Sequence, residues 1–173
     1  MASYYYLMSS LPMLRADGEM PLTYEEFLSR CRGSVSDQRY EMLSSLSVDS
    51  SEGPLVSDWA AFYGKLKAEL TYQRSVRLGR GIPAPTERDD AAVRAVSAAM
   101  NEKDPLAAEK LLLAMEFEQL DALVSLHYFD EAALIGYALK LKLLERKTIF
   151  RFSEGKAELE GIVASIQDQI VRI

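Results

Sequence analysis

Residues 104–127 read DPLAAEKLLLAMEFEQLDALVSLH, and this stretch decides the fold. Asp104 stands directly before Pro105, which places a helix-capping side chain in front of a proline at the first helical position. The apolar residues that follow are spaced as on a helix and show no strand-like alternation. The pattern predicts a helix over 105–127. His127, the one histidine of the chain, is expected to cap its C-terminal end, where an imidazolium meets the negative end of the helix dipole.

A second long helix is predicted over 131–152, with Asp130 as its N-cap. Its inward face is expected to be an apolar stripe at helical spacing, formed by Leu134, Tyr137, Leu141, Leu144, Thr148 and Phe152. After Gly155 the sequence predicts a last helix, whose stripe is Leu159, Ile162, Val163, Ile166, Ile170 and Ile173.

Five charged residues of the 131–152 helix are the candidate functional residues of the chain. Lys140, Arg146 and Lys147 lie off the apolar stripe and are expected to project outward. Lys142 and Glu145 are three residues apart, a spacing at which opposite charges on a helix surface pair.

Towards the N-terminus, Thr23 and Glu26 form a capping box that predicts a helix over 24–32, ended by Gly33. A second short helix is predicted over 37–46. The run Tyr4–Met8 fits a strand or a helical turn almost equally well, and we favour the helix.

The middle of the chain is predicted to hold one long and one shorter helix. Ser57 is expected to cap the long helix, and Gly79 is placed to end it in a left-handed conformation. Its expected face is Trp59, Phe62, Tyr63, Leu66, Leu70, Gln73 and Arg77. The glycines and prolines after it predict a flexible loop over 79–90. Thr86 and Asp89 resemble a capping box before a helix over 88–101.

These elements predict an all-α, single-domain helical bundle over residues 1–173. The length fits one domain, and 49% of the residues are hydrophobic against 27% charged. The net charge of −6 opposes binding to nucleic acid or to anionic lipid. The longest uncharged apolar run, residues 132–139, is far shorter than the about 20 residues of a membrane span.

The N-terminus lacks the features of a secretory signal, and Cys31 has no second cysteine with which to pair, so we expect a reducing cytoplasm. Cys31 itself is expected to be a small buried hydrophobic residue.

The residues that catalysis requires are scarce. One histidine and one cysteine exclude a multi-His or multi-Cys metal cluster. Glu116, Glu118 and Asp121 are interpreted as surface charges. We therefore expect no catalytic, cofactor-binding or metal-binding residue, and no enzymatic activity.

The charge distribution is uneven. Residues 65–81 and 140–156 each hold more Lys and Arg than Asp and Glu, although the whole chain is acidic. A basic surface that meets an acidic partner would give this pattern, and so would two solvated helix faces.

The segment 135–149, IGYALKLKLLERKTI, resembles the C-terminal helix of the V/A-type ATPase central-stalk subunit called d in eukaryotes and C in archaeal-type enzymes. The family pattern is matched at Lys142, Glu145, Ile149 and Gly155-Lys156. Thr148 stands where Asn is usual, while Phe150 and Phe152 replace an Arg and an Ile. The opening Tyr4-Tyr5-Tyr6-Leu7 looks like the Tyr-x-Tyr start of the same family.

Members of that family are nearly twice as long and are built as three similar helical bundles. The resemblance thus implies an abbreviated version, similar to short bacterial proteins encoded beside V-type ATPase subunits. The replaced Asn and Arg remove polar groups, so the fold is expected to carry over better than the contacts.

What the resemblance implies is a non-catalytic subunit or accessory protein of a V/A-type rotary ATPase. It would couple the rotor axle to the proteolipid ring in ATP-driven ion or proton transport, on the cytoplasmic side and peripheral to the membrane. Its partner interface would be Lys140, Lys142, Glu145, Arg146 and Lys147. The alternatives are a small cytoplasmic adaptor or regulatory protein unrelated to ATPases and, third, a small hydrolase built on acidic residues.

Overall fold

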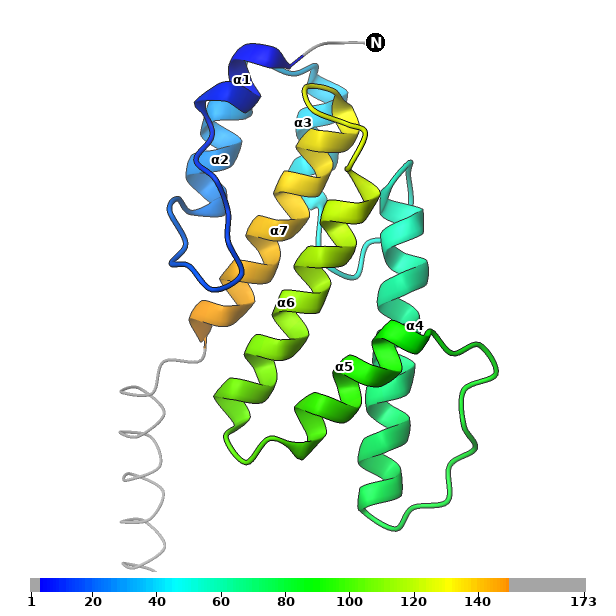
Figure 1. The fold of residues 1–173 in the computed structure, drawn as a ribbon. Coiled ribbons are helices and arrows are strands. Elements are labelled where there is room, and N and C mark those ends of the chain that lie inside the picture. Colours follow the sequence, from blue (N-terminus) through cyan, green and yellow to red (C-terminus); the bar gives the residue numbers. More distant parts are fainter. Residues whose placement is uncertain (1–3, 150–173) are drawn as a thin grey trace, which may run out of the picture.

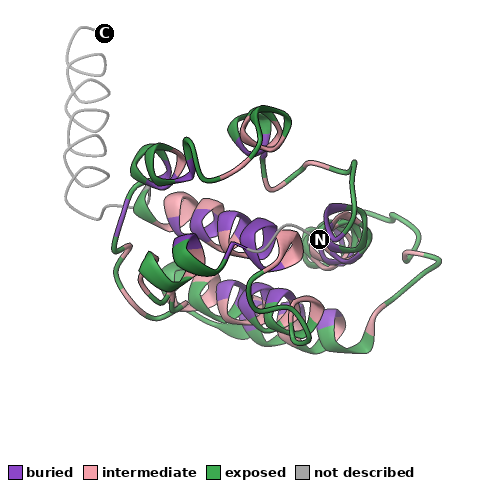
Figure 2. Cartoon of the chain, turned by 90° about the horizontal axis from the view of Figure 1, so that it is seen from above, coloured by how far each residue is buried: buried purple, intermediate pink, exposed green. Residues whose placement is uncertain are grey.

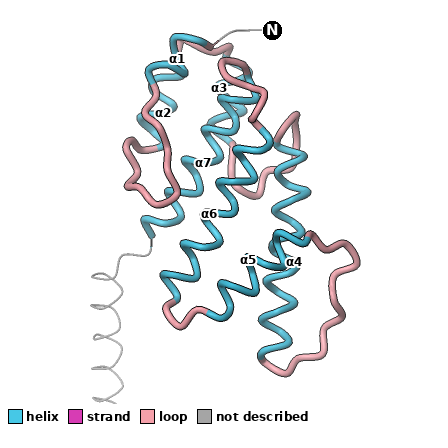
Figure 3. Tube along the Cα trace, viewed as in Figure 1, coloured by secondary structure: helices cyan, strands magenta, loops and turns pink. Residues whose placement is uncertain are grey.

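The computed structural model describes residues 4–149, and all regular structure in this range is helical (Figure 1; Figure 3). The predicted all-α class is confirmed. The helices are α1 (Tyr5–Ser10), α2 (Tyr24–Cys31), α3 (Asp37–Ser45), α4 (Val56–Arg77), α5 (Asp90–Asn101), α6 (Pro105–Leu123) and α7 (Glu131–Ile149).

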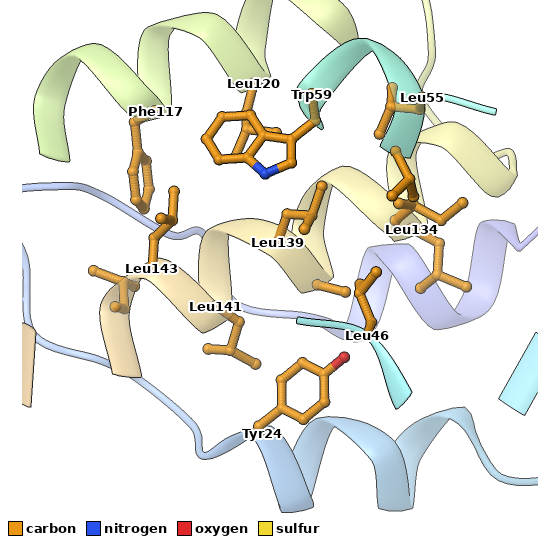
Figure 4. Close-up of a cluster of buried hydrophobic side chains, with 14 of the residues drawn as sticks. Tyr24, Leu46, Leu55, Trp59, Phe117, Leu120, Leu134, Leu139, Leu141 and Leu143 are labelled. Atoms are coloured by element: carbon orange, nitrogen blue, oxygen red, sulfur yellow. The ribbon is translucent and has the colours of Figure 1, made fainter. Parts of the chain in front are cut away.

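Helix α7 lies in the middle of the bundle, with α2 packed on one side and α6 on the other (Figure 1). Helix α5 packs against both α6 and α4. Figure 4 shows the core between these layers. Leu139, Leu141 and Leu143 of α7 lie between Trp59 and Phe117 on one side and the α2 side of the bundle on the other. Viewed from above, buried residues face the inside of the bundle and exposed residues its outside (Figure 2).

The local start signals are confirmed where a side chain bonds the backbone of the next turn. Both halves of the Thr23–Glu26 capping box form. Asp104 accepts from the Leu106 N–H, and Asp130 accepts from the Ala133 N–H. Gly33 and Gly79 adopt the positive φ expected after a helix, and Cys31 is fully buried.

The start of α4 differs from its prediction. The helix begins at Val56, and its N-cap is Leu55 and not Ser57. Leu55 has a φ of 61°, a left-handed conformation that leucine rarely adopts. Leu55 and Val56 are both buried, so packing against the core overrides the capping preference of Ser57.

Two further boundaries differ, and the predicted end of the last long helix lies outside the described residues. Helix α5 begins at Asp90, and its cap is Asp89, which accepts from the Ala92 N–H. The predicted capping box with Thr86 as the cap is therefore wrong, and Arg88 lies outside the helix. Helix α6 ends at Leu123, four residues before His127. The described part of α7 ends at Ile149, so Phe152 and the predicted helix with the Leu159–Ile173 stripe lie outside the described residues.

Helix α7 is buried over more of its surface than a single stripe. Leu134, Leu141 and Leu144 are buried as predicted, but the following residues off that stripe are buried too: Ala133, Ile135, Ala138, Leu139 and Leu143. Thr148, predicted to pack inward, is exposed. A helix enclosed by neighbours on several sides is apolar all round, and this explains why the one-stripe prediction is too narrow.

The loop between α1 and α2 is attached to α7 by side chains. The Tyr137 hydroxyl donates to the Pro12 carbonyl over 2.9 Å. The Lys147 ammonium donates to the carbonyls of Ala16 and Gly18, at 3.3 and 2.8 Å. Residues near the N-terminus are therefore held by a helix that begins more than a hundred residues later.

The loop between α4 and α5 contains no helix and runs back along α4 (Figure 3). Its far end is anchored by Arg88, which forms two hydrogen bonds with the Glu69 carboxylate, at 2.9 and 2.7 Å. Glu69 is only 2% exposed. The hydrogen bonds from Arg88 outweigh the effect of burial and hold the pKa of Glu69 below its usual value. The flexibility of the loop stays a prediction.

No helix in the described part of the chain is long and apolar enough to cross a membrane.

At Gly136, α7 lies close to Val124 at the end of α6. A Cβ added at Gly136 would lie 2.5 Å from Cγ1 of Val124, well inside van der Waals contact. Gly64, in the middle of α4, has nothing within 4 Å of the same position. The two glycines thus form a matched pair, one at a packed site and one at an open site.

We predict that Gly136→Ala lowers the free energy of unfolding by about 1–3 kcal/mol, because the stiff β-branched Val124 must move. Gly64→Ala should raise it by up to about 1 kcal/mol through helix propensity. Adding Val124→Ala should recover much of the loss in Gly136→Ala. Urea unfolding followed by Trp59 fluorescence measures all three, and equal gains from both glycine substitutions would contradict the close approach.

We predict that Glu69→Gln costs about 1 kcal/mol at pH 6, because an ionised hydrogen-bonded pair becomes a neutral contact. Because the folded-state pKa of Glu69 is lowered, this stabilisation is fully present above the unfolded-state pKa and is lost as the pH falls through the folded-state value. The difference between wild type and variant should therefore shrink on acidification. Unfolding free energies from pH 6 to pH 3 test this, and a difference independent of pH would count against the pair.

Candidate interaction surfaces

The five residues predicted as a partner interface all lie on α7. Lys142 and Glu145 form the expected pair, with 3.0 Å between Nζ and Oε2. The Lys142 ammonium also lies over the ring of Tyr24, 3.6 Å from its centroid. This cation–π contact joins α7 to α2.

Arg146 forms an ion-pair cluster with α6. Its guanidinium forms two hydrogen bonds with Glu116, at 3.1 and 2.6 Å, and lies 3.0 Å from a Glu109 oxygen. It also donates to the Tyr63 hydroxyl of α4 over 3.4 Å. Burial alone would lower the pKa of Arg146, but the hydrogen bonds and charges of the two carboxylates outweigh it and keep the guanidinium charged.

Glu116 is not the surface charge that the sequence led us to expect. It is 2% exposed, whereas Glu118 and Asp121 are exposed as expected. A signal in the sequence could have found it, because Glu116 shares a helical face with Leu112, Leu113 and Leu120. A carboxylate on the apolar face of a helix needs a cation from another element.

Lys140 and Lys147 also have partners within the chain. The Lys140 ammonium pairs with Asp121 of α6 and lies over the Phe117 ring, and Lys147 binds the α1–α2 loop. The expectation that Lys140, Arg146 and Lys147 project outward is therefore wrong: each is partly buried and bonded within the chain. The cause is the central place of α7, where residues off the apolar stripe meet neighbouring elements. A contact between these residues and another protein stays a prediction.

At the opposite end of α7, helix α1 and the loop between α6 and α7 carry five exposed apolar side chains. We call them the aromatic end surface: Tyr5, Tyr6, Leu126, Tyr128 and Phe129. The Tyr5 ring centroid lies 4.7 Å from that of Phe129 and 5.6 Å from that of Tyr6. Sequence patterns did not reveal this surface, because its two segments are more than a hundred residues apart.

A hollow of about 330 Å³ adjoins this surface at the start of α7. His127 Nδ1 and Asp130 Oδ2 are 2.5 Å apart at its edge. Burial would raise the pKa of Asp130, but hydrogen bonds from His127 and from the Ala133 N–H outweigh it and lower that pKa. The predicted role of His127 as a cap of α6 is therefore wrong, since it follows the end of α6 and bonds the N-cap of α7.

Two further carboxylates line the hollow. Glu131 pairs with Arg39 of α3 over 2.5 Å. Asp58 of α4 is exposed and makes no ion pair with any described residue. Within residues 4–149, no group of three or more His, Cys, Asp or Glu is arranged to hold a metal ion.

A scan against protein-family models and searches of curated proteins and of solved structures found no match to this chain.

We predict that Arg146→Gln lowers the free energy of unfolding by about 3–5 kcal/mol, because it leaves the buried Glu116 carboxylate without its cation. Lys140→Gln on the same helix should cost no more than about 1 kcal/mol, since its partner Asp121 is solvated. Adding Glu116→Gln to Arg146→Gln should recover part of the loss. Urea unfolding measures these differences. Similar losses of unfolding free energy for Arg146→Gln and Lys140→Gln would show that the buried cluster contributes no more to stability than a surface pair.

Proposed function

We propose that this chain is a non-catalytic subunit or accessory protein of a V/A-type rotary ATPase, similar to the central-stalk subunit called d in eukaryotes and C in archaeal-type enzymes. It would couple the rotor axle to the proteolipid ring in ATP-driven ion transport, peripheral to the membrane. The observation that carries the proposal is the resemblance of residues 135–149 to the C-terminal helix of that family.

Two features of the structure support the proposal. Residues 135–149 lie in the central helix of the bundle, so the resemblance concerns its main structural element. The second matching segment, at the N-terminus, packs at the start of the same helix: the Tyr4 N–H donates to the Phe129 carbonyl over 2.7 Å, and Tyr4 is buried. The two matching segments thus belong to one structural unit.

A coupling part must transmit force without deforming, and α7 is well connected for this task. Arg146 bonds α6 and α4, Lys142 contacts α2, and Tyr137 and Lys147 hold the α1–α2 loop. Bonds to several elements resist displacement of any one of them. Rigidity of this kind is what a force-transmitting scaffold requires.

A second candidate is a small helical adaptor or regulatory protein unrelated to ATPases. The aromatic end surface favours it, because the exposed rings of Tyr5, Tyr6 and Phe129 lie against one another, and exposed apolar patches are typical of protein-binding surfaces.

The test is affinity purification of the full chain, tagged at its C-terminus, from its native cells. If the proposal holds, the catalytic subunits, the axle and the proteolipid of a V/A-type ATPase are enriched over a tag-only control. Deletion of the gene should then reduce ATP-driven ion transport in inverted membrane vesicles to near background, and re-expression of the wild-type chain should restore it.

Recovery of other proteins without any ATPase subunit would favour the adaptor. Normal ion transport after deletion would exclude an obligatory coupling role.

A further inference from the structure

Figure 1 shows the end of the bundle where α1 meets the α6–α7 loop. This end combines an exposed apolar surface with a negatively charged hollow. Tyr6 is 88% exposed and Leu126 is 87% exposed. Tyrosine and phenylalanine are enriched in protein–protein interfaces, and tyrosine is also enriched among their hot-spot residues. A solvent-exposed cluster of aromatic side chains is therefore typical of a surface that binds a partner.

This surface is held in place before any partner arrives. Tyr4 fixes α1 to the α6–α7 loop through the bond from its N–H to the Phe129 carbonyl. Tyr5 packs on the ring of Phe129. A preformed surface loses little conformational entropy on binding, which favours affinity.

The adjoining hollow has the opposite chemistry. Its carboxylates are Asp58, Asp130 and Glu131, and the basic groups that face them are Arg39, paired with Glu131, and His127, bonded to Asp130. Asp58 makes no ion pair within the described residues. Negative charge therefore exceeds positive charge around the hollow, which is complementary to a cation.

The hollow is also large enough to take a single side chain. Its volume of about 330 Å³ is at the lower end of small-molecule sites, which span about 300–1,000 Å³. Apolar residues of three elements, Tyr4, Leu55 and Ile135, form part of its lining. An apolar wall with carboxylates at the rim suits the stem and head of an arginine or lysine.

We propose that this end of the bundle binds a basic amphipathic segment of another protein. One Arg or Lys of that segment enters the hollow beside Asp58, and its apolar residues cover the aromatic end surface. The inference stands on these residues alone and does not depend on the proposed ATPase function.

Two other occupants fit less well. A second copy of the chain would bring two sets of carboxylates together, and like charges in an interface are unfavourable. An anionic membrane surface would be repelled by the same carboxylates and by the net charge of −6.

The test begins with the photo-crosslinking amino acid p-benzoylphenylalanine, incorporated in the full chain in place of Tyr6 in native cells. The matched control places it at Leu78, which is also apolar and exposed but lies at the far end of α4. The protein segment crosslinked at position 6 and not at position 78 is identified by mass spectrometry and synthesised as a peptide. Its affinity is then measured against wild type and folded variants.

We expect the captured segment to carry an Arg or Lys flanked by apolar residues. Tyr6→Ser and Leu126→Ser should each weaken peptide binding at least tenfold, while Leu78→Ser leaves it unchanged. Asp58→Lys should also weaken binding at least tenfold, and a peptide with its cation changed to Glu should regain affinity for Asp58→Lys. Rescue by the charge exchange separates a specific pair from general stickiness.

Four results would overturn the proposal. The first is no crosslink to protein at position 6 above the position 78 control. The second is a captured segment without a basic residue, or one that binds Asp58→Lys as well as wild type. The third is a crosslink to a second copy of the chain, which would make this surface a dimer interface. The fourth is a crosslink to lipid together with Tyr6-dependent binding to phosphatidylglycerol vesicles, which would make it a membrane contact.

Discussion

The arrangement of α6 and α7 depends on one interaction, the pair between Glu116 and Arg146. Two hydrogen bonds with fixed geometry require both helices to keep one register, since a shift by one residue would remove the guanidinium from the carboxylate. A buried pair of this kind adds little net stability over apolar residues of the same size, but breaking it is costly. We infer that its contribution is to specify one packing among several that the leucines alone would permit.

From the sequence alone, the basic residues of α7 look like an exposed surface, because their acidic partners, such as Glu116, lie elsewhere in the chain. The uneven charge of the sequence is compatible with an acidic partner and with solvated faces. In the structure, Arg146, Lys140 and Lys142 pair with carboxylates of α6 and α7, and Lys67 of α4 pairs with Asp49. A local excess of positive charge can thus be compensated by segments distant in sequence. A partner that contacts α7 would have to compete with these bonds or use other atoms.

The sequence predicts those features that depend on residues close together in the chain. The Thr23–Glu26 box and the cap at Asp104 bond the backbone two or three residues away, so their pattern is sufficient. Burial decides against the local pattern at Leu55, where the helix begins before its expected cap. Neither the partner of Glu116 nor the aromatic end surface could be predicted from the sequence, because both join residues from separate parts of the chain. Helical periodicity shows which face a residue occupies but not which element lies opposite.

The attachment of the α1–α2 loop to α7 has a consequence for the order in which the protein is made. Pro12, Ala16 and Gly18 are synthesised more than a hundred residues before Tyr137 and Lys147, which hold them. During translation, helices α4 to α6 are complete and able to pack on one another while α2 still lacks the leucines of α7 on which it rests. The N-terminal segment therefore lacks its native contacts until α7 has been synthesised. Its native contacts close a large loop, a step that slows folding, and the protein reaches its final form only after the central helix has been translated.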